Sequence, residues 1–181
     1  VNSMNDAPTS SNKTMSGIED TNYIFVASDF NFSDIDGDLL SSIEITSLVS
    51  AGYLKLNGSS VTLNQVISKA DIDSSLLVFM PIANENGTSY DSYGFSVSDG
   101  TTYSAIYTMT MDISAINDLP TSASFGKGLN EDSSSVISTG QFSYSDSDGD
   151  PLSSVKIASI PTAGQLKLNG AVVSNNQVIP K

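Results

Sequence analysis

The sequence contains no cysteine, histidine, tryptophan or arginine. Without cysteine the chain cannot form a disulfide bond, so a folded domain must rely on its core or on a bound metal. The Ser/His and Cys/His nucleophile systems are excluded, and zinc catalysis has few ligands to draw on. Glycoside hydrolysis needs only two carboxylates, but the carboxylates here gather in a few short segments, at the junctions of the internal repeat described below, rather than in an evident pocket. We therefore do not expect an enzyme.

Positive charge is scarce as well. Only 7 lysines stand against 20 acidic residues, and the formal net charge is -13. Nucleic acid and anionic membrane surfaces are therefore not expected partners, because both are bound through basic surfaces. Of the acidic residues 16 are Asp and 4 are Glu, and Asp prefers turns and caps to helix interiors. The negative charge is expected in loops, where it aids solubility or binds a cation.

Long apolar runs are also missing. No stretch approaches the roughly 18 apolar residues of a membrane-spanning helix, so direct membrane insertion is not expected. Residues 1–8 carry neither the basic region nor the apolar run of a signal peptide. If the parent protein is exported, we expect its targeting signals to lie outside this chain.

What the chain does contain is an internal repeat. Equivalent residues are 112 apart throughout, as from 5 to 117 and from 34 to 146. The recurring segments are Asn5-Asp6-Ala7-Pro8 with Asn117-Asp118-Leu119-Pro120, Glu19-Asp20 with Glu131-Asp132, Asp34-Ile35-Asp36-Gly37-Asp38 with Asp146-Ser147-Asp148-Gly149-Asp150, and Leu54-Lys55-Leu56-Asn57-Gly58 with Leu166-Lys167-Leu168-Asn169-Gly170. One register held over this length without insertions indicates tandem repeats.

The repeat predicts how the chain is divided. Residues 1–4 align with 113–116 and are expected to end a preceding repeat. Residues 5–116 form a complete repeat, and residues 117–181 form a linker and the N-terminal part of a second one. We expect a longer array in the natural protein, with about three further strands of the second repeat supplied after Lys181.

Strand signals dominate each repeat. Alternating or β-rich segments predict strands at 23–32, 42–48, 53–56, 61–63, 76–80, 93–97 and 103–113, with one short helical turn within 68–74. Asn57-Gly58 is typical of a hairpin turn. Seven or eight short strands in about 110 residues predict an all-β fold, an immunoglobulin-like antiparallel β-sandwich in tandem with the second repeat incomplete. A jelly roll or small barrel is the alternative.

The acidic residues form clusters that suit calcium. Asp34, Asp36 and Asp38, and their counterparts Asp146, Asp148 and Asp150, each offer three carboxylates from one turn. Calcium takes six to eight oxygen ligands. The loop is not an EF-hand, because that loop needs Gly at its sixth position and Glu at its twelfth. Asp-Gly sequences also form turns without metal, but recurrence together with the Glu-Asp and Asn-Asp-x-Pro segments favours Ca²⁺.

The segments Phe95-Ser96-Val97-Ser98-Asp99-Gly100 and Ile116-Asn117-Asp118-Leu119-Pro120 resemble the end of a cadherin repeat and its linker. Over nearly its whole length, the chain resembles the cadherin-like tandem repeats of large bacterial surface adhesins, including RTX-type adhesins. The resemblance implies cadherin-like sandwiches with calcium between successive domains. Ala115 departs from the pattern, which has an acidic residue two positions before the linker Asn, and this implies fewer or weaker ions.

The resemblance also implies two ligand sets. The set at the intact junction comprises Asp99, Asn117, Asp118, Glu131, Asp146 and Asp148, with Asp150 as an additional ligand. The set of the first repeat comprises Asn5, Asp6, Glu19, Asp34, Asp36 and Asp38. It lacks the donor from a preceding repeat and is expected to bind more weakly.

These features predict a calcium-rigidified extender repeat of a bacterial cell-surface or secreted adhesin. The expected location is extracellular or at the bacterial cell surface, and the expected partners are neighbouring repeats of the same chain. The alternative is a module that binds carbohydrate or another copy of itself. Sugar sites usually present exposed aromatic rings, for which Tyr53 and Tyr90 are the candidates.

Overall fold

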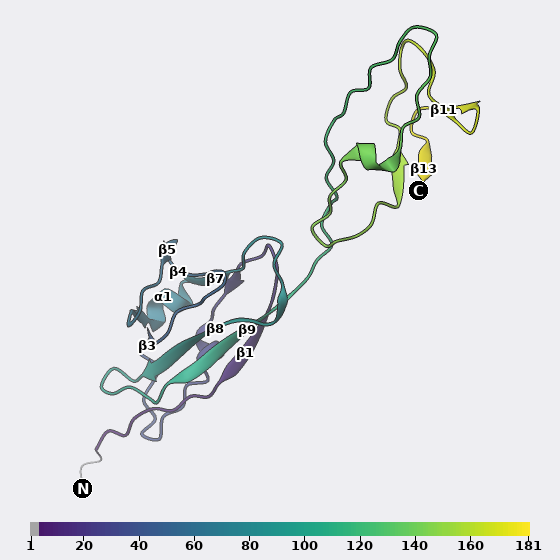
Figure 1. The fold of residues 1–181 in the computed structure, drawn as a ribbon. Helices are drawn as coiled ribbons and strands as arrows, with labels where there is room; N and C mark the ends of the chain where they lie inside the picture. The colour runs from purple at the N-terminus through teal and green to yellow at the C-terminus, as the bar shows by residue number, and fades with distance from the viewer. Residues whose placement is uncertain (1–3) are drawn as a thin grey trace. The chain divides into compact units, whose positions relative to one another are not determined.

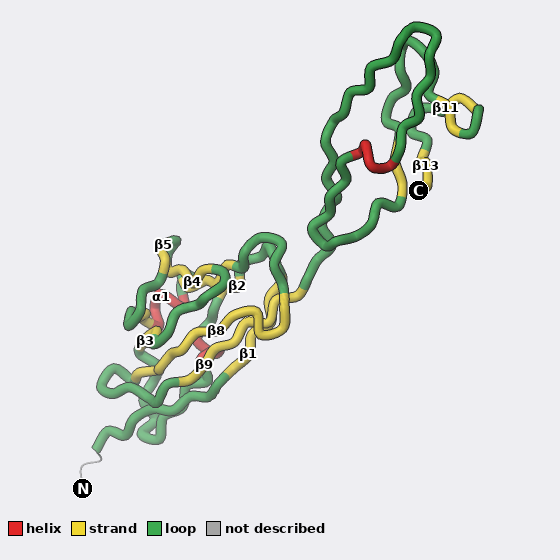
Figure 2. The backbone as a smooth tube through the Cα atoms, in the orientation of Figure 1, coloured by secondary structure: helices red, strands yellow, loops and turns green. Residues whose placement is uncertain are grey.

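The computed structural model describes residues 4–181, and its contacts divide the chain into two compact units, Val1–Ile116 and Asn117–Lys181. We call them unit 1 and unit 2. Figures 1 and 2 show strands and loops in both units, with helix confined to short turns. Within the described residues no helix has the length and apolar character needed to cross a membrane.

Unit 1 is an all-β, immunoglobulin-like sandwich of two sheets. The first sheet has the order β1 (Lys13–Ile18), β9 (Tyr107–Ser114), β8 (Gly87–Ser98), β3 (Ser42–Ile45) and β6 (Val66–Ser68). The second has the order β2 (Tyr23–Ile24), β7 (Leu77–Met80), β4 (Tyr53–Leu56) and β5 (Ser59–Ser60). All neighbouring strands are antiparallel except β1 and β9, which are parallel.

The core of unit 1 lies between the inward faces of these sheets. In β3 the alternation predicted from sequence is confirmed, because Ile43 and Ile45 are buried and their neighbours are less so. Aromatic rings fill the middle of the core, where Phe25 meets Tyr93 edge to face with ring centroids 5.9 Å apart. Such pairs add to the stabilisation from burial alone.

Several elements of unit 1 differ from the sequence expectation. The strand expected at 61–63 is not formed, because the hairpin returns earlier, in β5, and β6 is a further strand that the pattern did not predict. The segment expected as one strand over 23–32 is short strand β2 followed by a 3-10 helix, η1 (Ala27–Phe30). Asn31 then adopts a positive φ of 43°, which ends the turn. Strand β1 was not predicted, because Lys13–Ile18 carries a glycine and few β-branched residues. The expected helical turn is α1 (Lys69–Asp73), capped by the Ser68 side chain.

Unit 2 repeats the local structure of the first half of unit 1. Its elements are η2 (Thr139–Phe142), β10 (Ser154–Lys156), β11 (Lys167–Leu168), β12 (Ala171–Val172) and β13 (Val178–Pro180), paired as β10 with β13 and β11 with β12. The bridge between Thr9 and Ser33 reappears between Thr121 and Ser145. Of the hydrophobic residues in 117–181, only Val173 is fully buried, so these turns form without a closed core around them.

Candidate functional site

Six of the predicted ligands of unit 1 lie where the chain enters the unit. They come from three segments: the residues before β1, the loop after the Thr9–Ser33 bridge, and the turn after β8. We call this group the acidic-loop cluster, which comprises Asn5, Asp6, Asp34, Asp36, Asp38 and Asp99. Because β8 runs antiparallel to β9, its last residue lies at the end of the sheet where β1 and β9 begin.

Backbone N–H groups hold the carboxylates of the loop in place. Asp34 Oδ1 accepts hydrogen bonds from the N–H groups of Asp36 at 2.8 Å and Asp38 at 3.2 Å. Asp36 Oδ2 in turn accepts one from the N–H of Asp6 at 2.7 Å. Gly37, with a φ of 85°, allows the tight turn. The loop is thus tied to the segment that leads into β1.

Asp99 is tied to the same segment. The Asn5 amide donates to Asp99 Oδ2 at 2.9 Å, and the N–H groups of Thr101 and Thr102 donate to Asp99 Oδ1 at 2.6 and 2.8 Å. These donors stabilise the charged form, the Asn5 amide most and then the two backbone groups, and they lower the pKa of Asp99 from 3.8 to about 2. The carboxylate therefore stays ionised across the physiological range.

Among the described residues 4–181, one oxygen of the cluster has no hydrogen-bond partner. Asp34 Oδ2 is shielded from solvent and makes no hydrogen bond, although buried polar atoms are nearly always satisfied. Hard oxygen donors and an unsatisfied carboxylate oxygen suit calcium chemistry. Within residues 4–181, however, no three acidic side chains are already arranged to hold a metal ion. The oxygen donors are of the kind that Ca²⁺ prefers, but the carboxylates would have to move closer together to hold an ion.

Unit 2 contains the same loop with one change. Asp148 Oδ2 accepts from the N–H of Asp118 at 2.6 Å, and Asp146 Oδ1 accepts from the N–H groups of Asp148 and Asp150, both at 3.1 Å. Here the Tyr144 hydroxyl lies 3.4 Å from Asp146 Oδ2 and donates to the carbonyl of Asp150 at 2.9 Å. The equivalent residue in unit 1 is Phe32, which has no hydroxyl. Tyr144 was missed at the level of sequence, where the only signal for it is the Phe32-to-Tyr144 difference between the two repeats.

Glu19 does not join the cluster to which the sequence assigned it. It follows β1, whereas Asn5 and Asp6 precede that strand, so the six residues of β1 separate them by roughly 20 Å at about 3.3 Å per residue. Glu19 is only 1% exposed and accepts hydrogen bonds from the N–H of Ile116 at 2.8 Å and the Asn86 amide at 3.0 Å. The equivalent Glu131 is exposed.

Asp99 also lies with other residues than expected, because a strand separates it from the residues with which it was grouped. Asp99 was expected beside Asn117 and Asp118, but it lies beside Asn5. Asn117 directly follows Ile116, whose N–H is bound by Glu19 at the opposite end of unit 1. Since β9 runs the length of the sheet between these points, Asp99 belongs to the acidic-loop cluster of its own unit.

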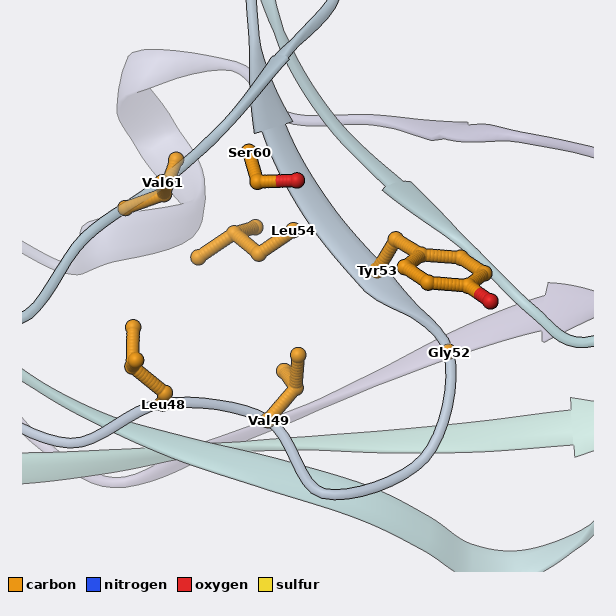
Figure 3. Close-up of a pocket in the computed structure, with 7 residues that line it drawn as sticks. All are labelled: Leu48, Val49, Gly52, Tyr53, Leu54, Ser60 and Val61. Atoms are coloured by element: carbon orange, nitrogen blue, oxygen red, sulfur yellow. The ribbon is translucent and has the colours of Figure 1, made fainter.

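The two candidate aromatic platforms differ. Tyr53 is 54% exposed and lies on a shallow groove, which is otherwise lined by Leu48, Val49, Gly52, Leu54, Ser60 and Val61 (Figure 3). The Lys55 ammonium lies 5.6 Å from the centre of its ring. The Tyr90 hydroxyl donates to Glu85 at 3.0 Å and accepts from the N–H of Ile82 at 3.2 Å. Tyr53 is the one aromatic ring among the residues that line this groove, whereas the hydroxyl of Tyr90 is held by Glu85 and Ile82.

Comparison with known proteins identifies the family of the chain. No curated protein and no solved structure matches it. The profile of the bacterial Ig domain family matches residues 5–112. Domains of this family are typically structural or adhesive modules, and they are commonly extracellular or surface-exposed. Because the match covers more than half of the chain and agrees with the sandwich described above, the protein belongs to the bacterial Ig domain family.

Proposed function

We propose that the chain is a calcium-binding extender segment of a bacterial cell-surface or secreted adhesin. In this proposal the acidic-loop cluster binds Ca²⁺ and fixes the segment through which the chain enters unit 1, and the equivalent loop of unit 2 does the same there. An ordered segment resists bending, which a repeat needs in order to act as a spacer. The more specific resemblance to RTX-type adhesins is part of the proposal.

The observation that carries the proposal is the unsatisfied Asp34 Oδ2, which belongs to a loop held by a hydrogen-bonded clasp that both units repeat. The clasp is the hydrogen bond from the N–H of Asp6 to Asp36, which recurs from Asp118 to Asp148. It brings the carboxylates of the loop to the incoming chain. Carboxylates that share one loop repel one another, and a bound cation would offset their charge.

The cluster supplies ligands of the class calcium requires. Asp34, Asp36 and Asp38 offer carboxylate oxygens from one loop, and Asp99 and Asn5 offer oxygens from the other two segments. A cation bound by these groups would cross-link residues before β1 to two loops of the sandwich. Extracellular calcium modules bind at about 10⁻⁴–10⁻³ M, so we expect occupancy at millimolar calcium.

Scanning calorimetry of the 181-residue chain with calcium and with chelator tests the proposal. At a Kd of about 1 mM, 10 mM calcium should stabilise a site by about 1.4 kcal/mol and raise the melting temperature by several degrees. Asp34→Asn should remove most of this rise. Asp73→Asn makes the same change in charge on α1, outside the cluster, and should keep it. An unchanged melting curve in the parent chain, or an equal rise in both variants, would contradict the proposal.

A further inference from the structure

We infer that unit 1 carries tension mainly through the parallel pair of β1 and β9, and that Glu19 is the residue that closes this pair. We call β1 and β9 the terminal strand pair. The inference rests on the proposed extender role only in assuming that load enters and leaves through the ends of the chain. It does not depend on calcium.

The direction of the two strands sets how they meet a load. The chain enters unit 1 just before β1 and leaves it just after β9, and the two strands are parallel neighbours in register from Lys13 with Met109 to Ile18 with Ser114. Tension between the chain ends therefore pulls β1 toward its start and β9 toward its end. The strands are loaded in opposite directions along a common axis, which is shear.

In shear the bonds between two strands resist together. The hydrogen bonds of a parallel pair are evenly spaced along it, so they share the load instead of breaking one after another. β1 is an edge strand, and among the described strands it pairs with β9 alone (Figure 1). The terminal strand pair is thus the contact that must fail before β1 leaves the sheet.

The pair is extended beyond the strands at both ends. At its start the N–H of Thr108 donates to Asn12 Oδ1 at 2.8 Å. At its end the N–H of Glu19 donates to the carbonyl of Ser114 at 3.0 Å. These bonds lengthen the sheared contact by one residue at each end.

Glu19 adds the contact closest to the point where load leaves the unit. Its carboxylate accepts from the N–H of Ile116, beyond the end of β9, and from the amide of Asn86, before the start of β8. A buried carboxylate with donors on the departing chain and on the neighbouring loop joins the end of β1 to both. Tension on Ile116 therefore stretches the Glu19 contact first.

A second side chain anchors the other end of β1. Lys13 donates to the carbonyl of Ser28 at 3.2 Å and lies 3.5 Å from Asp29 Oδ1. Asp29 is buried and also accepts from the N–H of Val26 at 3.0 Å. β1 is therefore tied down at both ends, by Lys13 to the body of the unit and by Glu19 to the departing chain.

Single-molecule pulling of the 181-residue chain in two geometries tests the inference. The sequence has no cysteine, so substitutions create unique attachment points. Handles at Met4→Cys and Leu119→Cys, both exposed positions, load the terminal strand pair in shear and leave most of unit 2 outside the loaded segment. Handles at Met4→Cys and Ile106→Cys lie at the same end of the parallel pair and open it one residue pair at a time.

We expect a severalfold higher unfolding force in the shear geometry, measured in chelator so that calcium plays no part. Equal forces in the two geometries would overturn the inference. A failure of the calorimetric calcium test would leave this result untouched, so the two proposals can fail separately.

Variants then test Glu19 itself. Glu19→Ala should lower the force in shear and change it little in the unzipping geometry, while Glu19→Gln, which retains an acceptor for Ile116, should fall between. The matched control is Ile72→Val or Ile72→Ala in α1, whichever comes nearer to Glu19→Ala in equilibrium stability. If that control lowers the shear force as much as Glu19→Ala does, Glu19 has no particular part in bearing load.

Discussion

Asp91 Oδ2 accepts a hydrogen bond from the N–H of Ala51 at 2.7 Å and so fixes the loop that precedes β4. The same carboxylate accepts from the N–H and hydroxyl of Ser50 and from the N–H of Ser92. Asp91 is only 6% exposed. A buried carboxylate with several donors is expensive to disturb, because the donors lose their partner without regaining water.

Asp91→Asn should therefore destabilise unit 1 by about 1–3 kcal/mol. The new amide would present a donor where backbone N–H groups already point. Chemical denaturation of the chain measures the change as a lower midpoint. Asp73→Asn on α1, where the side chain is well exposed, should change stability by no more than about 0.5 kcal/mol. Equal midpoints for the two variants would show that the Asp91 contacts contribute nothing.

Unlike Asp91→Asn, the substitution Tyr93→Phe should not lower the stability of unit 1. Tyr93 is fully buried, and its hydroxyl has no hydrogen-bond partner in the described part of the chain. Burial raises the pKa of Tyr93 well above 10.0, so the hydroxyl is neutral and carries only the cost of its lost hydration. Removing it should leave stability unchanged or increase it by about 1 kcal/mol. A loss of stability on denaturation would show that the hydroxyl has a partner in solution.

The acid titration of Asp99 should depend on Asn5. The pKa of Asp99 is about 2 in the folded chain against an ordinary 3.8. The stabilisation from its ionised form is thus fully present above pH 3.8 and is lost as the pH falls toward 2. Asn5→Ala removes the largest cause and should move the pKa back toward 3.8. Carboxyl chemical shifts followed by NMR in chelator measure this directly.

The Asn12→Ala variant serves as the control for this titration. Asn12 donates nothing to Asp99, and its side chain accepts from Thr108, so the Asp99 pKa should stay near 2. A pKa of about 2 that persists in Asn5→Ala would assign the shift to the Thr101 and Thr102 N–H groups instead.

The alternation of apolar and polar residues predicted core strands such as β3, because the apolar residues of these strands are the buried ones. Ile43 and Ile45 alternate with polar residues in sequence and face the core in the structure. The Asn57-Gly58 turn likewise follows from dipeptide chemistry, and both residues have positive φ. Strand β1 could not be found in this way, because it is an edge strand stabilised by β9, which lies far away in sequence.

The repeat spacing pointed to the residues of the acidic-loop cluster, but it did not predict which of the candidate ligands lie together in space. The Asp34 and Asp146 loops depend on local turn chemistry, which the repeat displays directly. Asp99 and Glu19 were assigned to the wrong ends because a strand separates residues near in sequence by its full length. The hydrogen bonds from Asn5 to Asp99 and from Ile116 to Glu19 correct that assignment.

The difference between Phe32 and Tyr144 makes the two copies of the loop chemically unequal. In unit 2 a phenol lies near the carboxylate oxygen that has no partner in unit 1. A cation entering the proposed site of unit 2 must compete with that hydroxyl, whereas at Asp34 it meets no such competitor. On the proposed function, the two copies therefore differ in calcium affinity, and the site of unit 1 fills at a lower calcium concentration than that of unit 2.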